Sequence, residues 1–286
     1  MITPEEEKQI LNHAYIPEHI VGLMTSVSGG EPFLIEDYFC CRRKDWIVVV
    51  GYPLQNDFIM NEFERALDKI IKRFRPRYVS LIAPELPLSL AASCRERESD
   101  HYYTLDIHDR SARSGLIRAV KKAMEHLTVE RAADMRKAHY ELSLEFIERV
   151  NPSPRIRNLL FKMPDYITHS SNSVVLNAWS DQNNLAAFYI VDLAAGNFST
   201  YVIGCHSKKN YVKGASDLLF FEMIKISNEY NKKYIHLGLG VNKGIRQFKE
   251  KWGGIPTRGY EMCELVVRKP SIFDALTAIR KMKRTN

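Results

Sequence analysis

The chain has 286 residues, of which 45% are hydrophobic and 26% are charged, as is usual for a globular protein. This length favours two domains or one large one, and such a chain can bury a core without disulfides or a structural metal. The formal net charge of +7 favours contact with phosphate, nucleic acid or anionic lipid, although a basic surface that serves only solubility is an equal alternative.

Cysteine usage and the first residues predict the compartment. The five cysteines form no CxxC pair, so we expect reduced thiols rather than a disulfide framework or a zinc ribbon. They are Cys40, Cys41, Cys94, Cys205 and Cys263. The start, MITPEEEKQ, lacks the apolar segment of a signal peptide, and no run approaches the ~18 apolar residues of a membrane-spanning helix. The sequence therefore predicts a cytoplasmic protein without a transmembrane segment.

The first part of the chain predicts strands and one helix. Residues 32–43 (PFLIEDYFCCRR) and 45–53 (DWIVVVGYP) are rich in β-branched and aromatic residues, which favour strands. Residues 61–74 (NEFERALDKIIKRF) place their apolar side chains on one face of a helix, and residues 77–86 (RYVSLIAPEL) predict a buried strand.

A polar segment follows at residues 100–109 (DHYYTLDIHD). On a strand, alternation would place Asp106 and His108 on one face, and both residue types bind metals. A polar strand end explains the same residues, and we prefer it, so no metal site is predicted.

Residues 128–150 predict a long helix that connects two halves. Thr128 is a candidate N-cap, and apolar residues recur at helical spacing after it. The following NPSP, residues 151–154, contains two prolines that a continuous helix excludes. We therefore predict an N-terminal domain at residues 1–127, a connecting helix at 128–151 and a C-terminal domain at 152–286.

The second half repeats this order of elements. A turn at AAGN, residues 194–197, separates two of its strands, and Ser216 is a candidate N-cap for its helix. On that helix, the spacing of Glu222 from Leu219 predicts an exposed carboxylate. In chain order, the predicted elements are strands at 173–181, 185–193 and 198–206, a helix at 216–231 and a strand at 232–240.

The two halves can be aligned with each other. Strand, helix and strand at residues 45–86 match strand, helix and strand at residues 199–240, and Tyr78 and Tyr234 fall at the same point after a basic residue. A common β-α-β rhythm could produce this match by chance. The similar helix lengths and strand starts favour an internal duplication.

Residues 237–254 (LGLGVNKGIRQFKEKWGG) combine five glycines with a basic amphipathic run. The third glycine follows the second by four positions, so the run does not fit a dinucleotide-binding fingerprint. Gly238 and Gly240 more simply permit positive φ and a close approach of the backbone. The sequence contains no G-x-S-x-G, H-E-x-x-H or Walker A pattern, which argues against common hydrolase, zinc protease and P-loop sites.

Residues 214–254 resemble the C-terminal part of the GNAT-like N-acyltransferase superfamily, and most closely its Fem-type branch, which includes the aminoacyl transferases that build peptidoglycan bridges. That branch has a strand, a glycine-containing turn, a helix, and a Phe-Lys pair followed shortly by glycine. The matching segments are Leu237–Gly240, Asn242–Gly244, Phe248–Lys249 and Gly253–Gly254. The branch consists of two tandem GNAT-like domains, which agrees with the duplication.

The resemblance implies an α/β (α+β) fold of two tandem GNAT-like domains, each a mixed central sheet flanked by helices. In this fold the sheet parts beside its central strand to hold the donor's pantetheine arm or an equivalent, and a helix N-terminus faces the pyrophosphate. The C-terminal domain would hold this donor site. The N-terminal domain would be structural or would shape the acceptor cleft.

The donor turn would be residues 206–216 (HSKKNYVKGAS), and an ordinary basic loop capped by Ser216 is the alternative. The superfamily's acyl-CoA signature Q/R-x-x-G-x-G/A is not kept, because Tyr211 stands three residues before Gly214 and Ser216 two after it. The implied donor is therefore either an acyl-CoA or an aminoacyl-tRNA, whose phosphates suit a basic surface. The residues that the resemblance assigns to this turn are Lys208, Lys209, Lys213, Gly214, Ala215 and Ser216.

On the following strand and helix, the resemblance assigns donor contacts to Gly238, Gly240, Asn242, Arg246 and Phe248. Asn242 matches the asparagine that bonds the pantetheine amide in many GNATs, and Phe248 stands where acyl-CoA enzymes carry an acidic tyrosine. Lys249, in the donor channel, is the candidate catalytic residue. With an ordinary pKa of ~10.4 it would be charged, and it would stabilise a phosphate or an oxyanion rather than act as a base. The alternative is that Lys249, Glu250 and Lys251 form a solvated face.

The sequence therefore predicts an acyltransferase or aminoacyltransferase that moves an acyl group from acyl-CoA or aminoacyl-tRNA to an amine, with no tightly bound cofactor. The alternatives are a catalytically inactive GNAT-fold protein that binds tRNA or another polyanion, and a non-enzymatic scaffold. The tail at residues 272–286 predicts an amphipathic helix with a basic end. Those cations would stabilise the helix end or extend a polyanion-binding surface.

Overall fold

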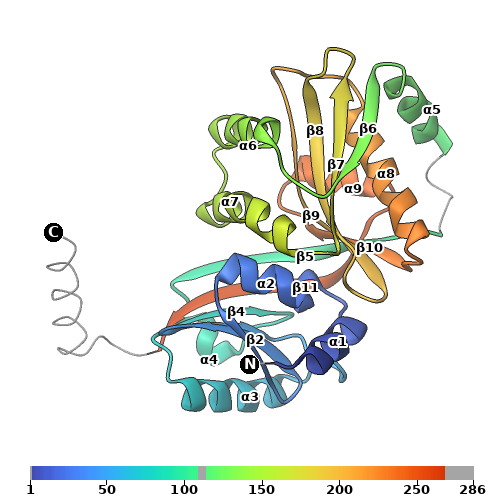
Figure 1. Ribbon diagram of the computed structural model, residues 1–286. Helices are drawn as coiled ribbons and strands as arrows, with labels where there is room; N and C mark the ends of the chain where they lie inside the picture. The colour runs from blue at the N-terminus through green and yellow to red at the C-terminus, as the bar shows by residue number, and fades with distance from the viewer. Residues whose placement is uncertain (1, 109–113, 268–286) are drawn as a thin grey trace, which may run out of the picture. The chain divides into compact units, whose positions relative to one another are not determined.

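The computed structural model describes residues 2–108 and 114–267, which fall into two compact units. One unit comprises Gly30–Ser99 and residues 260–267, and the other comprises Ile2–Gly29 and Asp100–Gly259. Both combine strands of mixed direction with helices (Figure 1). The connecting segment that was predicted at residues 128–151 lies inside the second unit.

The first unit contains strands β1 (Glu31–Ile35), β2 (Tyr38–Arg43), β3 (Trp46–Val50) and β4 (Tyr78–Ala83), and the end of β11 (Ile255–Val266). Neighbouring strands are antiparallel except β3 and β4, which are parallel. Helix α3 (Met60–Phe74) joins these two, and a short helix, α4 (Leu88–Ala91), follows β4. The strands and the helix predicted between residues 45 and 86 are confirmed.

The core of the first unit forms where α3 covers the strands. Phe63, Leu67 and Ile70 recur at helical spacing on the buried face of α3, and they join one apolar cluster with residues of the strands. Each such side chain contributes ~1.5–3 kcal/mol when it is fully buried. The helix ends where Arg75 takes a left-handed conformation, with a φ of 46°.

The single strand predicted at residues 32–43 is wrong, because this segment is a hairpin of β1 and β2. Glu36, at the turn, has a φ of 56°. The carboxylate of Asp37 accepts hydrogen bonds from the backbone N–H groups of Gln55 and Asn56, each at 3.0 Å. The hydrogen bonds of Asp37 to this loop stabilise the turn between β1 and β2. The pattern of β-branched residues in the sequence does not reveal them.

The strands of the second unit lie in the order β5, β10, β9, β8, β7 and β6. Their bounds are β5 (Glu96–Asp106, within this unit from Asp100), β6 (Leu127–Ala132), β7 (Ser173–Ser180), β8 (Leu185–Asp192), β9 (Phe198–His206) and β10 (Tyr234–Leu239). Strands β9 and β10 are parallel and are joined by α8 (Ala215–Glu229), and the other neighbours are antiparallel. The strands predicted in the second half of the chain are confirmed.

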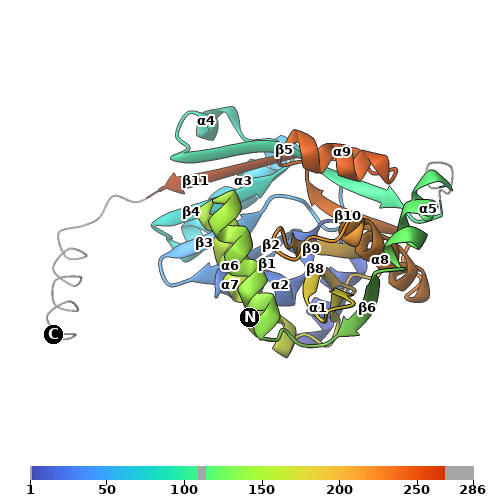
Figure 2. The same cartoon turned by 90° about the horizontal axis from the view of Figure 1, so that it is seen from above.

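Helices cover both faces of this sheet (Figure 1 and Figure 2). On one face, Met163 and Tyr166 of α7 pack with Phe188 of β8, and on the other Leu219 of α8 packs with Val191. The first face carries α1 (Pro4–His13), the 3₁₀ helix η1 (Pro17–His19), α2 (Val21–Ser28), α6 (Lys137–Val150) and α7 (Pro154–His169). The second carries α5 (Ser114–Ala123), α8 and α9 (Lys243–Lys251).

The helix predicted at residues 128–150 is wrong in its first part. Residues Leu127–Ala132 form β6, which pairs with β7, and the helix α6 follows later. Thr128 and Val129 are β-branched and favour a strand, so Thr128 is not an N-cap. Asn151, with a φ of 47°, ends α6 at the predicted place.

Two predictions about α8 are also wrong. Its N-cap is Gly214 rather than Ser216. Glu222 is 6% exposed, because Arg131 of β6 reaches α8 and binds its carboxylate at 2.6 Å, and Lys225 binds it at 2.8 Å. Helical spacing alone could not reveal a strand that brings an arginine to this face.

The prediction that all thiols are reduced is wrong, because Cys94 and Cys263 form a disulfide within the first unit. Their Cα atoms lie 5.3 Å apart, a usual distance for a disulfide, although the two residues are 169 positions apart in the sequence. Strand β11 returns to pair with β4 and so brings Cys263 into this unit. Cys40, Cys41 and Cys205 are free and buried.

Within residues 2–108 and 114–267, none of the helices combines the length and the apolar composition that a bilayer-spanning helix requires. In the same residues, no three histidine, cysteine, aspartate or glutamate side chains are grouped to hold a metal ion. The helix predicted at residues 272–286 lies outside the described residues.

Candidate functional site

Strands β9 and β10 lie side by side for a short distance and then part. Along the described lengths of both strands, their parallel pairing covers Phe198–Thr200 against Tyr234–His236. Beyond this, β9 continues to His206 as a partner of β8, and β10 continues to Leu239 as a partner of β5. The facing edges of β9 and β10 are therefore not bonded to each other after Thr200 and His236. The predicted parting of the sheet is present.

The backbone of β10 explains why the ladder stops. The pairing register with β5 shifts between His236 and Gly238, and Gly238 has a φ of 72°, which favours glycine. A Cβ at Gly240 would lie 2.8 Å from Oδ1 of Asp100, so only glycine lets that carboxylate approach. Asp100 accepts hydrogen bonds from the N–H groups of Val241 and His101, both at 2.7 Å. Both predicted glycines thus shape the end of β10.

Asn242 begins the helix that follows this turn. Its Oδ1 accepts a hydrogen bond from the N–H of Ile245 at 3.0 Å, which makes it the N-cap of α9. A contact between Asn242 and a donor amide would therefore use its side-chain NH₂ group. Arg246, in the first turns of α9, is exposed.

Lys249 lies on the buried side of α9. It is 5% exposed, its Nζ donates a hydrogen bond to the carbonyl oxygen of Leu239 at 2.5 Å, and Nζ lies 5.5 Å from the ring centre of Tyr103. Burial lowers the pKa of Lys249 to about 7, and the carboxylate of Asp100 opposes this shift. The solvated-face alternative and the ordinary pKa are therefore wrong for Lys249, whereas Glu250 is exposed. Near neutral pH this amine can gain or lose a proton.

The turn before α8 is held by a carboxylate of the chain itself. Glu145 of α6 accepts hydrogen bonds from the N–H of Lys208 (2.6 Å), the N–H of Lys209 (3.3 Å) and the hydroxyl of Ser207 (2.8 Å). Burial acts to raise the pKa of Glu145, but these hydrogen bonds lower it overall. The side chains of Lys208, Lys209 and Lys213 are exposed, so they remain accessible to a ligand.

The start of α8 has the character of an anion site. Gly214 has a φ of 87°, and across the described residues no side chain caps the helix. A Cβ at Gly214 would lie 3.0 Å from the Cβ of Ala123, so the glycine also permits the approach of α5. The N–H of Ala215 donates to the carbonyl oxygen of Val212 at 3.3 Å, and the N–H of Ser216 belongs to a helix end that no side chain caps in the described residues. A helix end of this kind attracts phosphate.

Phe248 packs among aromatic rings between α9 and α8. Its ring packs against Phe220 of α8 at 5.4 Å, and Phe220 stacks on Trp252 at 4.9 Å. The indole N–H of Trp252 donates to Asp217 at 2.8 Å. Phe248 therefore joins α9 to α8, and a donor contact for it is not supported.

Sequence analysis missed two polar residues where the strands part. Thr200 and His236 are both 1% exposed. In the predicted strand at 232–240, His236 lies on the same face as Tyr234 and Gly238. A histidine within an apolar strand was therefore a signal that could have been used.

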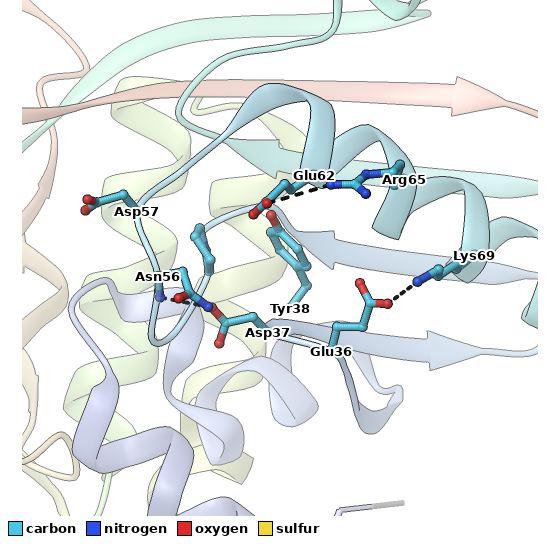
Figure 3. A pocket seen from close by; sticks show the side chains of 9 residues that line it. Glu36, Asp37, Tyr38, Asn56, Asp57, Glu62, Arg65 and Lys69 are labelled. Carbon is cyan, nitrogen blue, oxygen red and sulfur yellow. Dashed lines mark hydrogen bonds and ion pairs between the residues drawn. The ribbon is translucent and has the colours of Figure 1, made fainter.

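The first unit has a different feature at the corresponding place, after β3 and before α3. A cavity of about 290 Å³ opens there, and Figure 3 shows carboxylates around it. Burial and the neighbouring carboxylates of Asp37 and Glu62 raise the pKa of Tyr38 to about 12. Its charged lining residues are Glu36, Asp37, Asp57, Glu62, Arg65 and Lys69.

Solved structures are similar to this chain over nearly its whole length. The C-terminal domain of a predicted lysylphosphatidylglycerol synthetase from Agrobacterium fabrum is 14% identical, with a TM-score of 0.61, and 98% of this chain and 96% of that chain are covered. FemX is 11% identical, with a TM-score of 0.60 and coverage of 91% and 96%. A tandem GNAT protein from the clavulanic acid biosynthesis pathway is 10% identical, with a TM-score of 0.60 and coverage of 94% and 97%.

No protein-family model matches the sequence, and no curated protein does. Because the identities are this low, the structural similarity establishes the fold alone. The fold is mixed α/β and GNAT-like, as the sequence predicts.

Proposed function

We propose that this chain is an acyltransferase that moves an acyl or aminoacyl group from a phosphate-bearing carrier to an amine. The observation that carries the proposal is the parting of β9 and β10 beside an uncapped helix N-terminus. Two strand edges without a mutual ladder offer N–H and C=O groups to an extended arm, and a helix N-terminus offers N–H groups to its phosphates.

The names of the similar structures support the same class of reaction. They include a lysylphosphatidylglycerol synthetase domain, FemX and GNAT proteins. The Phe-Lys pair and the glycines after it favour the Fem-type branch, and this branch assignment belongs to the proposal. The carrier is then acyl-CoA or aminoacyl-tRNA, because both bear phosphates beside an activated acyl group.

In the proposed reaction, the nitrogen lone pair of the acceptor attacks the carbonyl carbon of the thioester or ester. The C–N bond forms, the C–S or C–O bond breaks with its electron pair on the leaving sulfur or oxygen, and the proton that the amine loses ends on that leaving atom. Lys249 has a pKa of about 7, so its neutral form can accept a proton and its charged form can balance a phosphate or an oxyanion. This widens the role that sequence analysis gave to Lys249.

The proposal is tested by mass spectrometry of ligands retained on the purified protein, together with calorimetry using acetyl-CoA and aminoacyl-tRNA. We expect one carrier to be retained or bound and to yield an acylated amine with a panel of amines. If neither carrier binds and no amine is acylated, the proposal is wrong.

A second candidate is a catalytically inactive GNAT-fold protein that binds tRNA or another polyanion. It is favoured by the exposed lysines of the turn before α8, and by Phe248, which supplies no acid. Filter binding with tRNA at several salt concentrations distinguishes the two candidates. A steep loss of affinity with salt, without any transfer product, would favour this second function.

A further inference from the structure

The last rung at which β9 and β10 pair carries two buried polar side chains. Thr200 and His236 are partners in the parallel register, so they project from the same face of the sheet. In the part of the chain that the structure describes, neither Oγ1 of Thr200 nor Nε2 of His236 has a hydrogen-bond partner. Buried polar atoms nearly always have one, so both atoms require an explanation.

The hydrogen bond at the other ring nitrogen fixes the tautomer of His236. The backbone N–H of Gly238 donates to Nδ1 at 3.2 Å, so Nδ1 carries the lone pair and a neutral ring carries its proton on Nε2. Burial, followed by the nearby cations Lys249 and Arg258 and by His19, lowers the pKa of His236 to about 3. At physiological pH the ring is neutral, and Nε2–H is a hydrogen-bond donor.

Aromatic rings surround this donor. The ring of His236 lies 4.9 Å from that of Tyr102 on β5 and 5.8 Å from that of Phe198 on β9, and Phe198 stacks on Tyr234 at 5.3 Å. A hydrogen bond made by Nε2 would therefore be shielded from water and stronger than one at the surface.

Two other buried polar side chains of this unit, those of His139 and Lys232, are satisfied by the chain. His139 is 0% exposed, yet its Nε2 lies 2.8 Å from Oδ1 of Asn177, and its Nδ1 accepts from the N–H of Arg136 at 2.8 Å. The buried Nζ of Lys232 donates to two backbone carbonyl oxygens. Thr200 and His236, by contrast, lie where the strands part, and this position indicates that their partner is a ligand atom.

We propose that Nε2 of His236 and Oγ1 of Thr200 donate hydrogen bonds to the carbonyl oxygen of the acyl group that is transferred. This inference rests on the proposed function. With the carrier's phosphates at the start of α8, its arm runs between the strand edges toward the last paired rung, and the acyl end reaches deepest. The carbonyl oxygen gains negative charge during attack, and two fixed donors that aromatic rings shield from water stabilise that charge.

The neutral charge of the hydrogen-bond donor Nε2–H determines which ligands can bind. A neutral imidazole N–H recognises an oxygen with a lone pair, but it does not demand the full negative charge that an ammonium group prefers. A bare thiol is only a weak acceptor, and a free ribose hydroxyl lacks the carbonyl oxygen that would reach the rung. The site should therefore distinguish an acylated carrier from the same carrier without its acyl group.

The first test observes His236 by NMR of protein labelled with ¹⁵N-histidine, with its signal assigned from a His236→Leu sample. We expect the shifts of a neutral ring protonated on Nε2. Acetyl-CoA should move the Nε2 signal and CoA should not. The same comparison is made with an RNA minihelix that bears an amide-linked amino acid at its 3′ end and with the bare minihelix.

The second test compares variants by calorimetry, melting temperature and turnover. His236→Leu should keep the affinity for the bare carrier, lose roughly tenfold in preference for the acylated one, as for one hydrogen bond, and lose kcat rather than KM for the amine. Its melting temperature should fall only by the loss of the hydrogen bond from the N–H of Gly238 to Nδ1, because the Nε2–H that is also lost has no partner in the described residues. Thr200→Val should behave alike with a smaller effect, and Thr200→Ser should retain the preference.

His139→Leu is the matched control, because it removes a buried histidine whose hydrogen bonds are made within the chain. It should lower the melting temperature and leave the preference unchanged. If His236→Leu instead lowers the melting temperature as much and keeps the preference, or if acylated and bare carriers move the His236 signal equally, the inference is wrong while the proposed function stands. If no carrier binds the unaltered protein, both are wrong.

Discussion

The two β-α-β units of the chain have one topology and different endings. In each, two parallel strands are joined by a helix, α3 in the first unit and α8 in the second. All five residues of β3 pair with β4, from Trp46 to Val50. In the second unit the pairing stops after Thr200 and His236, although both strands continue. The two units share this topology, so topology alone does not decide where a ligand can bind. The ends of the parallel strands decide it.

A glycine at the end of a strand has opposite effects in the two units. Gly51 follows β3, and its N–H donates to Ile82 at 2.6 Å, so the ladder continues. A Cβ there would lie 2.6 Å from Phe63 and 2.8 Å from Ala83, which shows that side chains fill the space. At Gly238 an added Cβ would meet no described atom within 4 Å. The first glycine permits dense packing, and the second permits an opening.

The charges beside the helix N-termini differ in the same way. Four carboxylates and two cations line the cavity beside α3, so this end of the first unit repels phosphate (Figure 3). The turn before α8 carries three exposed lysines. A phosphate-bearing carrier is therefore expected in the second unit alone.

The largest expected effect concerns Lys249. This buried lysine distinguishes the two units, because no buried lysine stands at the matching place among the described residues of the first unit. Its folded pKa is about 7 against an ordinary value of 10.5, so the unfolded chain binds more protons between these pH values. The free energy of unfolding should therefore rise with pH across this window, by up to ~4 kcal/mol, and remain at its lower level below pH 7.

Urea unfolding of the unaltered protein and of Lys249→Met between pH 6 and pH 10 measures this term. The variant should lack the rise and be the more stable protein at pH 6. Lys251→Met, at an exposed lysine of the same helix, should keep the rise. Parallel pH profiles for Lys249→Met and the unaltered protein would show that the amine is not buried in the folded state.

The next prediction concerns stability and the packed space around Gly51, after β3 in the first unit. Gly51→Val forces a branched side chain against Phe63 and Ala83 and should lower the free energy of unfolding by ~1–3 kcal/mol. Affinity for the carrier should not change, because the proposed donor site lies in the second unit. Gly115→Ala is the control, since an added Cβ meets no described atom within 4 Å there. Equal stability of the two variants in urea would contradict the packing argument.

A third effect separates the two helix N-termini by charge. The double variant Lys208→Glu/Lys209→Glu should weaken carrier binding roughly tenfold or more at low salt and flatten the dependence of affinity on salt concentration. The matched double variant in the first unit is Lys69→Glu/Lys72→Glu. Calorimetry at two salt concentrations should show no loss for this control, and an equal loss for both would indicate a general charge effect.

The sequence predicts those features that arise from near neighbours. The face of α3 follows from the spacing of Phe63, Leu67 and Ile70, and the end of α6 follows from Asn151 and the prolines. Gly238 marks the parting strands because its left-handed conformation shifts the pairing register at that point.

The features that the sequence does not predict depend on distant partners. Cys94 meets Cys263 only because β11 returns to β4, and Glu222 is buried only because β6 supplies Arg131. Lys249 looked like one of three charged residues on an exposed face. Its burial requires Tyr103 of β5, which comes from a part of the chain about 150 residues earlier.

The smallest expected effect tests whether the opening is maintained under strain. Val241 has a φ of 58° and is 59% exposed, and a β-branched residue is unfavourable in that conformation. Val241→Gly should raise the free energy of unfolding by ~1 kcal/mol, because the strain disappears and little apolar burial is lost. Asp100 binds the N–H of residue 241, so the turn should keep its shape and carrier affinity should stay the same. If the variant is more stable but binds the carrier less tightly, the valine holds the strands apart, and strain at the second unit's strand end becomes part of the difference between the two units.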